Sequence, residues 1–143
     1  KLSKSFNISS TNYKKTAFVS ACTSMEHLLN KHITLQNYSK EITEFNFTFT
    51  FLSPKDRFIC YYKNIQSTEE RTSIKINLPI EHPYFFELDE DTMYQYMIEV
   101  FLESAFVAAT LEPTFKEKAL FNDIKTLFYR YGWLTRIIFP AAS

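Results

Sequence analysis

The sequence predicts a single α+β domain over residues 1–143, with helices packed on one face of a mostly antiparallel sheet in the order β-α-β-β-β-α-α. Some segments alternate apolar and polar residues, which is typical of half-buried strands, whereas others repeat apolar residues every three or four positions, as helices do. Three consecutive strand-like segments have short links, which favours an antiparallel meander. With 143 residues, 45% of them hydrophobic, the chain can close one core without metals or disulfides.

The first half of the chain begins with a short strand and a helix. Residues 2–8 alternate apolar and polar side chains, and the polar cluster at 9–12 would end this strand and cap a helix. Between Tyr13 and about Lys31 the apolar residues are three and four apart, which predicts an amphipathic helix. The clearest strand covers residues 45–51, where phenylalanines alternate with polar residues. One face of this strand should therefore be built entirely of phenylalanine.

Two more strands complete the predicted sheet. Residues 53–56 form a turn, and residues 57–63, with apolar side chains on both faces, are expected to form a central strand covered on both sides. Residues 74–80 alternate again and predict another strand.

The last part of the chain predicts two helices. Asp89 is placed to cap the longer helix, which should end at Glu112-Pro113. A capping-box sequence at 114–117 opens the last helix, and Gly132 is placed just beyond its end. An apolar tail, 133–139, follows.

Composition excludes several classes of site. Because Gly132 is the only glycine, the chain cannot build the glycine-rich loops that bind nucleotide phosphates. Cys22 and Cys60 lie far apart in apolar contexts, so we expect buried thiols in a reducing compartment. The chain has neither a long apolar span nor a signal-like apolar start. A soluble, cytoplasmic protein that does not bind membranes is the expectation.

Catalytic and metal-binding patterns are weak. His27 and His32 are five positions apart, as are Cys22 and His27, so neither pair shares a helix face. The acids at 87–91 are best interpreted as complements of a helix dipole rather than as a glycosidase pair. We therefore expect no catalytic residues, no metal and no cofactor.

Charge is distributed unevenly along the chain. Residues 81–112 contain eight acidic residues and no lysine or arginine, although the whole chain has 16 of each charge. One interpretation is that these acids cap a helix and pair with Lys116, Lys118 and Lys125. The other is an acidic surface with tyrosine anchors, Tyr96 flanking it, that binds a basic protein rather than nucleic acid. The predicted partner-binding residues are Glu81, Tyr84, Glu87, Glu90, Asp91, Tyr94, Glu99 and Glu103.

The order of these elements resembles a known family. The resemblance rests on five segments: the alternating strand at 44–49, the Tyr-Tyr-Lys strand end at 61–63, the strand at 74–78, the helix through 94–98 and the closing helix at 121–127. This layout is similar to the small immunity proteins that protect bacteria from their own polymorphic or contact-dependent growth inhibition (CDI) toxins. The resemblance implies a cytoplasmic, non-enzymatic inhibitor of one cognate toxin C-terminal domain, often a nuclease.

Two further functions stay open on the sequence. A small ligand-binding or enzymatic domain would use Tyr61, Tyr62 and His82 in a site between sheet and helices, and a solidly filled core would argue against it. A homo-oligomer would dock through the apolar tail, whereas the immunity-protein interpretation favours a monomer over a homodimer.

Overall fold

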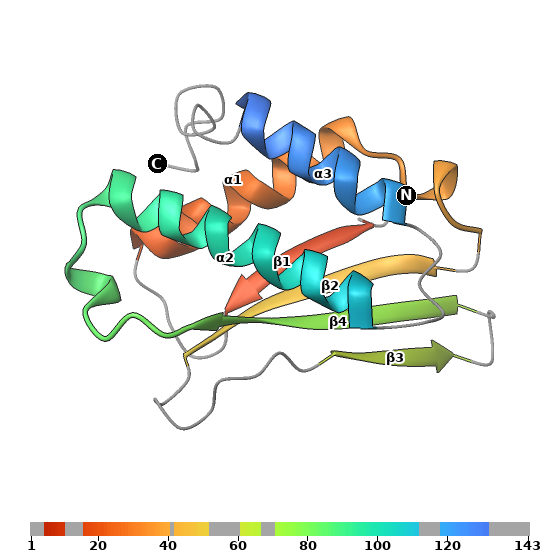
Figure 1. Cartoon of the computed structure of the whole chain (residues 1–143), viewed down its shortest axis with the longest axis horizontal. Helices are drawn as coiled ribbons and strands as arrows, with labels where there is room; N and C mark the ends of the chain where they lie inside the picture. Colours follow the sequence, from red (N-terminus) through yellow and green to blue (C-terminus); the bar gives the residue numbers. More distant parts are fainter. Residues whose placement is uncertain are drawn as a thin grey trace.

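The computed structural model describes residues 5–10, 16–40, 42–51, 61–66, 71–111 and 118–131. Three helices lie together on one side of the sheet (Figure 1). Along the chain the elements are β1 (Phe6–Ser10), α1 (Thr16–His32), η1 (Leu35–Asn37), β2 (Ile42–Phe51), β3 (Tyr61–Gln66), β4 (Arg71–Ile80), η2 (Phe85–Glu87), α2 (Glu90–Leu111) and α3 (Lys118–Tyr131). Apart from the short 3-10 turns η1 and η2, this is the predicted order. Cys60, the turn at 53–56, the capping box at 114–117, and Gly132 with the tail lie outside the described residues.

The prediction of a mostly antiparallel sheet is wrong. The strand order is β1-β2-β4-β3, in which β1, β2 and β4 run parallel and only β3 pairs antiparallel, with β4. The chain reaches β2 from β1 through α1, the kind of helical connection that parallel neighbours need. The next strand in the chain, β3, does not pair with β2. The strand after it, β4, lies between β2 and β3 and pairs with both. Therefore β3, predicted to be central, is an edge strand.

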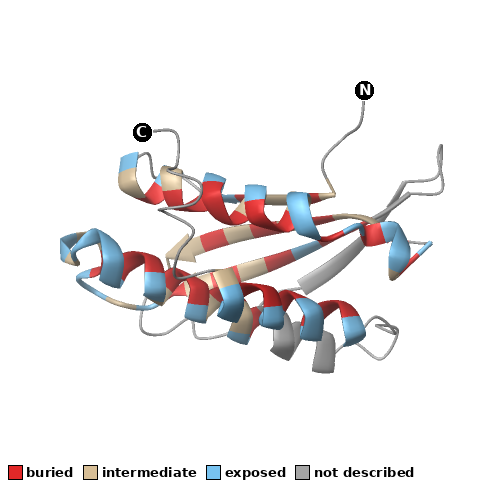
Figure 2. Ribbon diagram, turned by 90° about the horizontal axis from the view of Figure 1, so that it is seen from above, coloured by how far each residue is buried: buried red, intermediate tan, exposed pale blue. Residues whose placement is uncertain are grey.

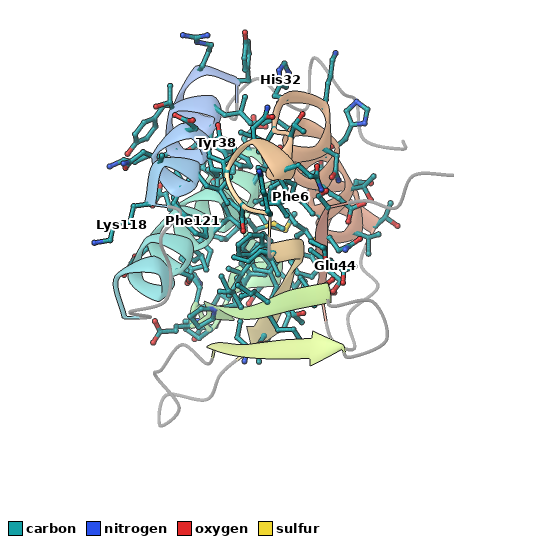
Figure 3. The ribbon with its side chains drawn as sticks, turned by 90° about the vertical axis from the view of Figure 1, so that its right-hand side faces the viewer. Phe6, His32, Tyr38, Glu44, Lys118 and Phe121 are labelled. Carbon is teal, nitrogen blue, oxygen red and sulfur yellow. The ribbon has the colours of Figure 1, made fainter. Side chains whose placement is uncertain are left out.

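The core fills the space between sheet and helices. Phe45, Phe47 and Phe49 of β2 are fully buried, as predicted, whereas Phe51 is only half-buried. The Phe47 ring lies 4.7 Å from that of Phe101 in α2, which in turn lies 5.2 Å from Phe128 in α3. Figure 3 shows the side chains filling this layer, and Figure 2 shows buried stripes along the helices. One continuous aromatic core thus joins the sheet to the helices above it.

The opposite face of the sheet is polar. The Asn7 side-chain amide donates to the Asn46 carbonyl oxygen at 3.1 Å, and the Asn46 amide donates to the Ser73 hydroxyl at 2.9 Å. These bonds cross β1, β2 and β4 on the side away from the helices. The polar half of each alternating pattern therefore occupies the face that does not form the core.

Candidate partner-binding surface

Asp89 determines where the acidic helix α2 begins. Its carboxylate accepts hydrogen bonds from the Thr92 backbone N–H and the Thr92 hydroxyl, both at 2.9 Å. These bonds lower the pKa of Asp89, because they stabilise the ionised form. The predicted N-cap is confirmed. Glu90 and Asp91 occupy the first turn, where negative charge complements the helix dipole.

Most of the predicted acids share the outer side of α2 and the loop before it. Met93, Met97 and Phe101 point into the core, which turns Asp91, Glu99 and the intervening polar positions toward solvent. We define the acidic surface by its exposed members, which are Glu81, Tyr84, Glu87, Glu90, Asp91, Glu99 and Glu103. Between Glu81 and Leu111 the chain has acidic residues but no lysine or arginine, so this segment is strongly acidic.

The loop that carries Tyr84 is held by local hydrogen bonds. The Tyr84 backbone N–H donates to Nδ1 of His82 at 3.1 Å, and the Glu81 N–H donates to the Tyr96 hydroxyl at 3.3 Å. The Glu87 N–H closes the turn by donating to the Tyr84 carbonyl at 2.9 Å. Tyr84 is nevertheless 63% exposed. A large aromatic side chain is thus presented to solvent on an ordered backbone.

Aromatic rings anchor this loop to the rest of the molecule. Phe86 lies 5.1 Å from Phe51 of β2 and 5.8 Å from Phe18 of α1, measured between ring centroids, and Phe85 lies 5.6 Å from Phe18. Phe86 remains half-buried, two positions after Tyr84 in the same loop. Phe86 was not among the predicted residues, although its position between Tyr84 and Glu87 was a usable signal.

Tyr94 does not belong to this surface. It is 2% exposed and joins the core, so the prediction that it is a surface anchor is wrong. The reason is helical geometry, since Tyr94 lies three positions before Met97 on the side of α2 that faces the sheet. Tyr96, half-buried, supports the surface indirectly through its bond to Glu81.

Among the residues that the structure describes, those considered for other chemistry are not assembled into a site. Cys22 is buried, and this burial raises the pKa of its thiol to about 12, with Glu26 adding to the shift, which leaves the thiol protonated and unreactive. His27 and His32 are exposed, and His32 stacks on Tyr131 at 5.3 Å. Burial, Lys31 and His27 lower the pKa of His32. Among the described residues, no group of three or more His, Cys, Asp or Glu could hold a metal ion.

A ligand site between sheet and helices has limited structural support. His82 lies at the exposed loop, 5.7 Å from the Tyr96 ring, rather than between these layers. The side chains of Tyr61 and Tyr62, like Lys116, are outside what the structure describes. Lys118 and Lys125 are exposed on α3, with Lys125 Nζ 5.7 Å from the centre of the Tyr129 ring. None of the helices in the described ranges is long and apolar enough to cross a membrane.

Comparison with known proteins identifies a family for this chain. The family model described as immunity protein 44 (Imm44) matches residues 4–130, a stretch that runs from before β1 almost to the end of α3. Neither a curated protein nor a solved structure matches the chain significantly. Since the matched residues cover nearly all of the sequence, the chain belongs to the immunity protein 44 family, whose name agrees with the resemblance to polymorphic-toxin immunity proteins.

Proposed function

We propose that this immunity protein neutralises the C-terminal domain of a cognate CDI or related polymorphic toxin in the bacterial cytoplasm by one-to-one binding, without catalysis. Membership of the immunity protein 44 family supports a toxin partner. The observation that carries the rest is the acidic surface, where carboxylates from one loop and one helix face solvent together. This surface fits a basic partner.

A nuclease is the kind of toxin that best fits such a surface. Nucleases bind the phosphates of their substrate through lysine and arginine side chains, and a row of carboxylates can imitate those phosphates. Asp91, Glu99 and Glu103 follow one another along the exposed side of α2, whose other side is fixed by core packing. Opposite charge would also speed association, since long-range attraction steers the encounter.

Tyr84 is the proposed anchor of the contact. Glu81 and Glu87 lie close to it in the same loop, so a lysine or arginine of the toxin could stack on the ring and pair with a carboxylate. The ordered loop reduces the entropy lost on binding. Aromatic side chains of this kind often dominate the energetics of interfaces.

The first test reverses charges together in E90K/D91K/E99K. We expect slower association with the toxin domain encoded by the neighbouring gene, and a weaker dependence of the association rate on salt, while circular dichroism shows a nearly unchanged fold. The matched control, K118E/K125E/R130E, reverses exposed charges on α3. Unchanged binding of the α2 variant, or equal slowing by both variants, would place the interface elsewhere.

The second test uses two tyrosines of similar exposure. Tyr84 is 63% exposed on the acidic surface, and Tyr129 is 59% exposed on α3. We expect Y84A to weaken binding by about 2 kcal/mol, roughly thirtyfold, Y84F to retain most of the affinity, and Y129A to behave as wild type. Calorimetry measures all of these affinities, and equal loss in Y84A and Y129A would contradict the anchor.

The proposal as a whole is tested in cells. Co-expression with the neighbouring toxin domain should protect bacteria from it, and the two proteins should elute together at equal stoichiometry. Cells that die despite soluble, folded immunity protein would refute the proposed function, whatever the mutants show.

A further inference from the structure

β1 forms one edge of the sheet, and the direction of its backbone groups follows from its pairing with β2. The Phe45 N–H donates to the Ser5 carbonyl at 2.8 Å, so Ser5 directs its carbonyl toward β2. Because backbone groups alternate along a strand, Phe6 and Ile8 direct theirs to the opposite side, away from β2. Such outward groups are the usual template for adding another strand.

Two side chains of α1 bond to the outward N–H groups of Phe6 and Ile8 and to the Phe6 carbonyl. The Phe6 N–H donates to Oδ1 of Asn30 at 3.1 Å, and Nδ2 of Asn30 donates back to the Phe6 carbonyl at 2.8 Å. The Ile8 N–H donates to Oε1 of Glu26 at 2.9 Å. The Asn30 amide therefore offers the same donor and acceptor pair that a residue of a neighbouring strand would offer.

The spacing of these side chains matches the spacing of the strand. Glu26 and Asn30 are four residues apart on α1, a rise of about 6 Å. Phe6 and Ile8 are two residues apart on β1, a rise of about 6.6 Å. A further bond, from Nδ2 of Asn30 to the Glu26 carbonyl at 3.0 Å, fixes the orientation of the Asn30 amide.

We propose that Glu26 and Asn30 form an edge lock, which prevents a second copy of this chain from pairing with β1. The Asn30 side chain bonds to the N–H and to the carbonyl of Phe6 at once, so it occupies both backbone groups with which Phe6 would pair to a further strand. The lock keeps the chain available as a single copy. It is independent of the acidic surface, since its residues lie on α1 and β1.

The test compares wild type with E26A/N30A, using sedimentation velocity over a concentration series and amide hydrogen exchange. We expect wild type to stay monomeric and the double variant to dimerise. In dilute solution the Phe6 and Ile8 amides of the variant should exchange about tenfold faster or more, and dimerisation at high concentration should protect them again. The backbone N–H of Asn7, which faces β2, is the internal reference for the exchange rates.

Two further variants separate the lock from general stability. E26Q keeps an oxygen that accepts from the Ile8 N–H and should behave as wild type. T23A is the control on the same helix, because it removes an exposed hydroxyl whose hydrogen bond, to the Val19 carbonyl, lies within α1. A folded E26A/N30A that stays monomeric, or a dimer whose Phe6 and Ile8 amides remain unprotected, would overturn the proposal. If the double variant does not fold, the single variant E26A provides the test. E26A should accelerate hydrogen exchange at the Ile8 backbone N–H but not at that of Phe6, and it should dimerise more than E26Q. Equal behaviour of E26A and E26Q would refute the lock.

Discussion

Asp89 is the residue at which the acidic surface is tied to the stability of α2. Its carboxylate caps the helix through Thr92, and its lowered pKa follows from those bonds. A carboxyl group with a depressed pKa in the folded state stabilises the fold above its unfolded pKa and loses that contribution as the pH falls through the folded pKa. We expect D89A to lower the melting temperature at neutral pH, with the difference from wild type shrinking in acid.

D89N separates the cap from the charge. An asparagine oxygen still accepts from the Thr92 N–H, so D89N should melt between D89A and wild type at neutral pH. The difference between D89N and D89A should change little in the acidic range, because position 89 no longer titrates in either variant. Melting curves at several pH values check both variants. A D89A difference that grows in acid would contradict the cap as the source of the effect.

Tyr38 makes a second pH-dependent contact. Its hydroxyl donates to the Asp123 carboxylate, which joins the turn after α1 to α3. This hydrogen bond, then burial and the charge of Asp123, raise the pKa of Tyr38 to about 12 from an ordinary value of 10.0. The neutral phenol therefore stabilises the fold fully below pH 10, and the contribution disappears as the pH rises toward about 12.

Y38F tests this contact. We expect a loss of about 1 kcal/mol in the free energy of unfolding at neutral pH, because a hydrogen bond to a charged group is removed. The high-pH absorbance titration of tyrosinate should lose a step near pH 12. Persistence of that step in Y38F would assign it to another tyrosine, and N122A, an exposed change beside Asp123, is the control.

At the scale of elements, β2 contributes the centre of the core. Phe47 is fully buried, its ring 4.7 Å from Phe101 and 5.9 Å from Phe45. We expect F47A to reduce the free energy of unfolding by about 3–5 kcal/mol through lost burial and a residual cavity. Urea titration measures this, and V19A, an exposed change on α1, should cost much less. A small loss in F47A would mean that the core rearranges around the cavity.

The sheet also shows what sequence pattern does and does not encode. Alternation predicted that residues 45–51 and 74–80 form strands and which side of each is buried, because the period of two fixes the face. It did not predict the strand order, because the face of a strand does not identify its neighbour. Strand length did not help either, because the alternating segments predicted from the sequence were of equal length, whereas in the structure β2 and β4 have 10 residues each and pair centrally, and β1 and β3, with 5 and 6, form the edges.

The candidate surface was predictable to a similar extent. The segment 81–112 was predicted to present an acidic surface, and its described acids, from Glu81 to Glu103, are exposed on a loop and a helix, since charged side chains are rarely buried. Tyrosines are amphipathic and offer no such rule. Tyr84 is exposed while Tyr94 is in the core, and only their positions relative to the helix stripe distinguish them.

At the scale of the whole molecule, the core, the acidic surface and the edge of β1 occupy separate places, so binding can be tested without disturbing the fold. The chain has no net charge, with 16 basic and 16 acidic residues, yet six of its acids belong to the acidic surface, in a segment without lysine or arginine. Attraction toward a basic toxin therefore arises from local charge, which salt screens over about 10 Å at 0.1 M. The association rate with the toxin domain should fall steeply as salt rises, while the dissociation rate changes less.

Binding should also stabilise the folded immunity protein by mass action. With free toxin domain at about 100 times its dissociation constant, we expect the free energy of unfolding to rise by about 2.7 kcal/mol. Stopped-flow mixing at several salt concentrations and melting curves of the complex measure the two effects. Because E90K/D91K/E99K changes surface charge but not the core, it should flatten the salt dependence of the association rate. It should lower the melting temperature of the free protein moderately, because positive charge in the first turn of α2 opposes the helix dipole. An association rate insensitive to salt in wild type would show that the acids do not guide the encounter.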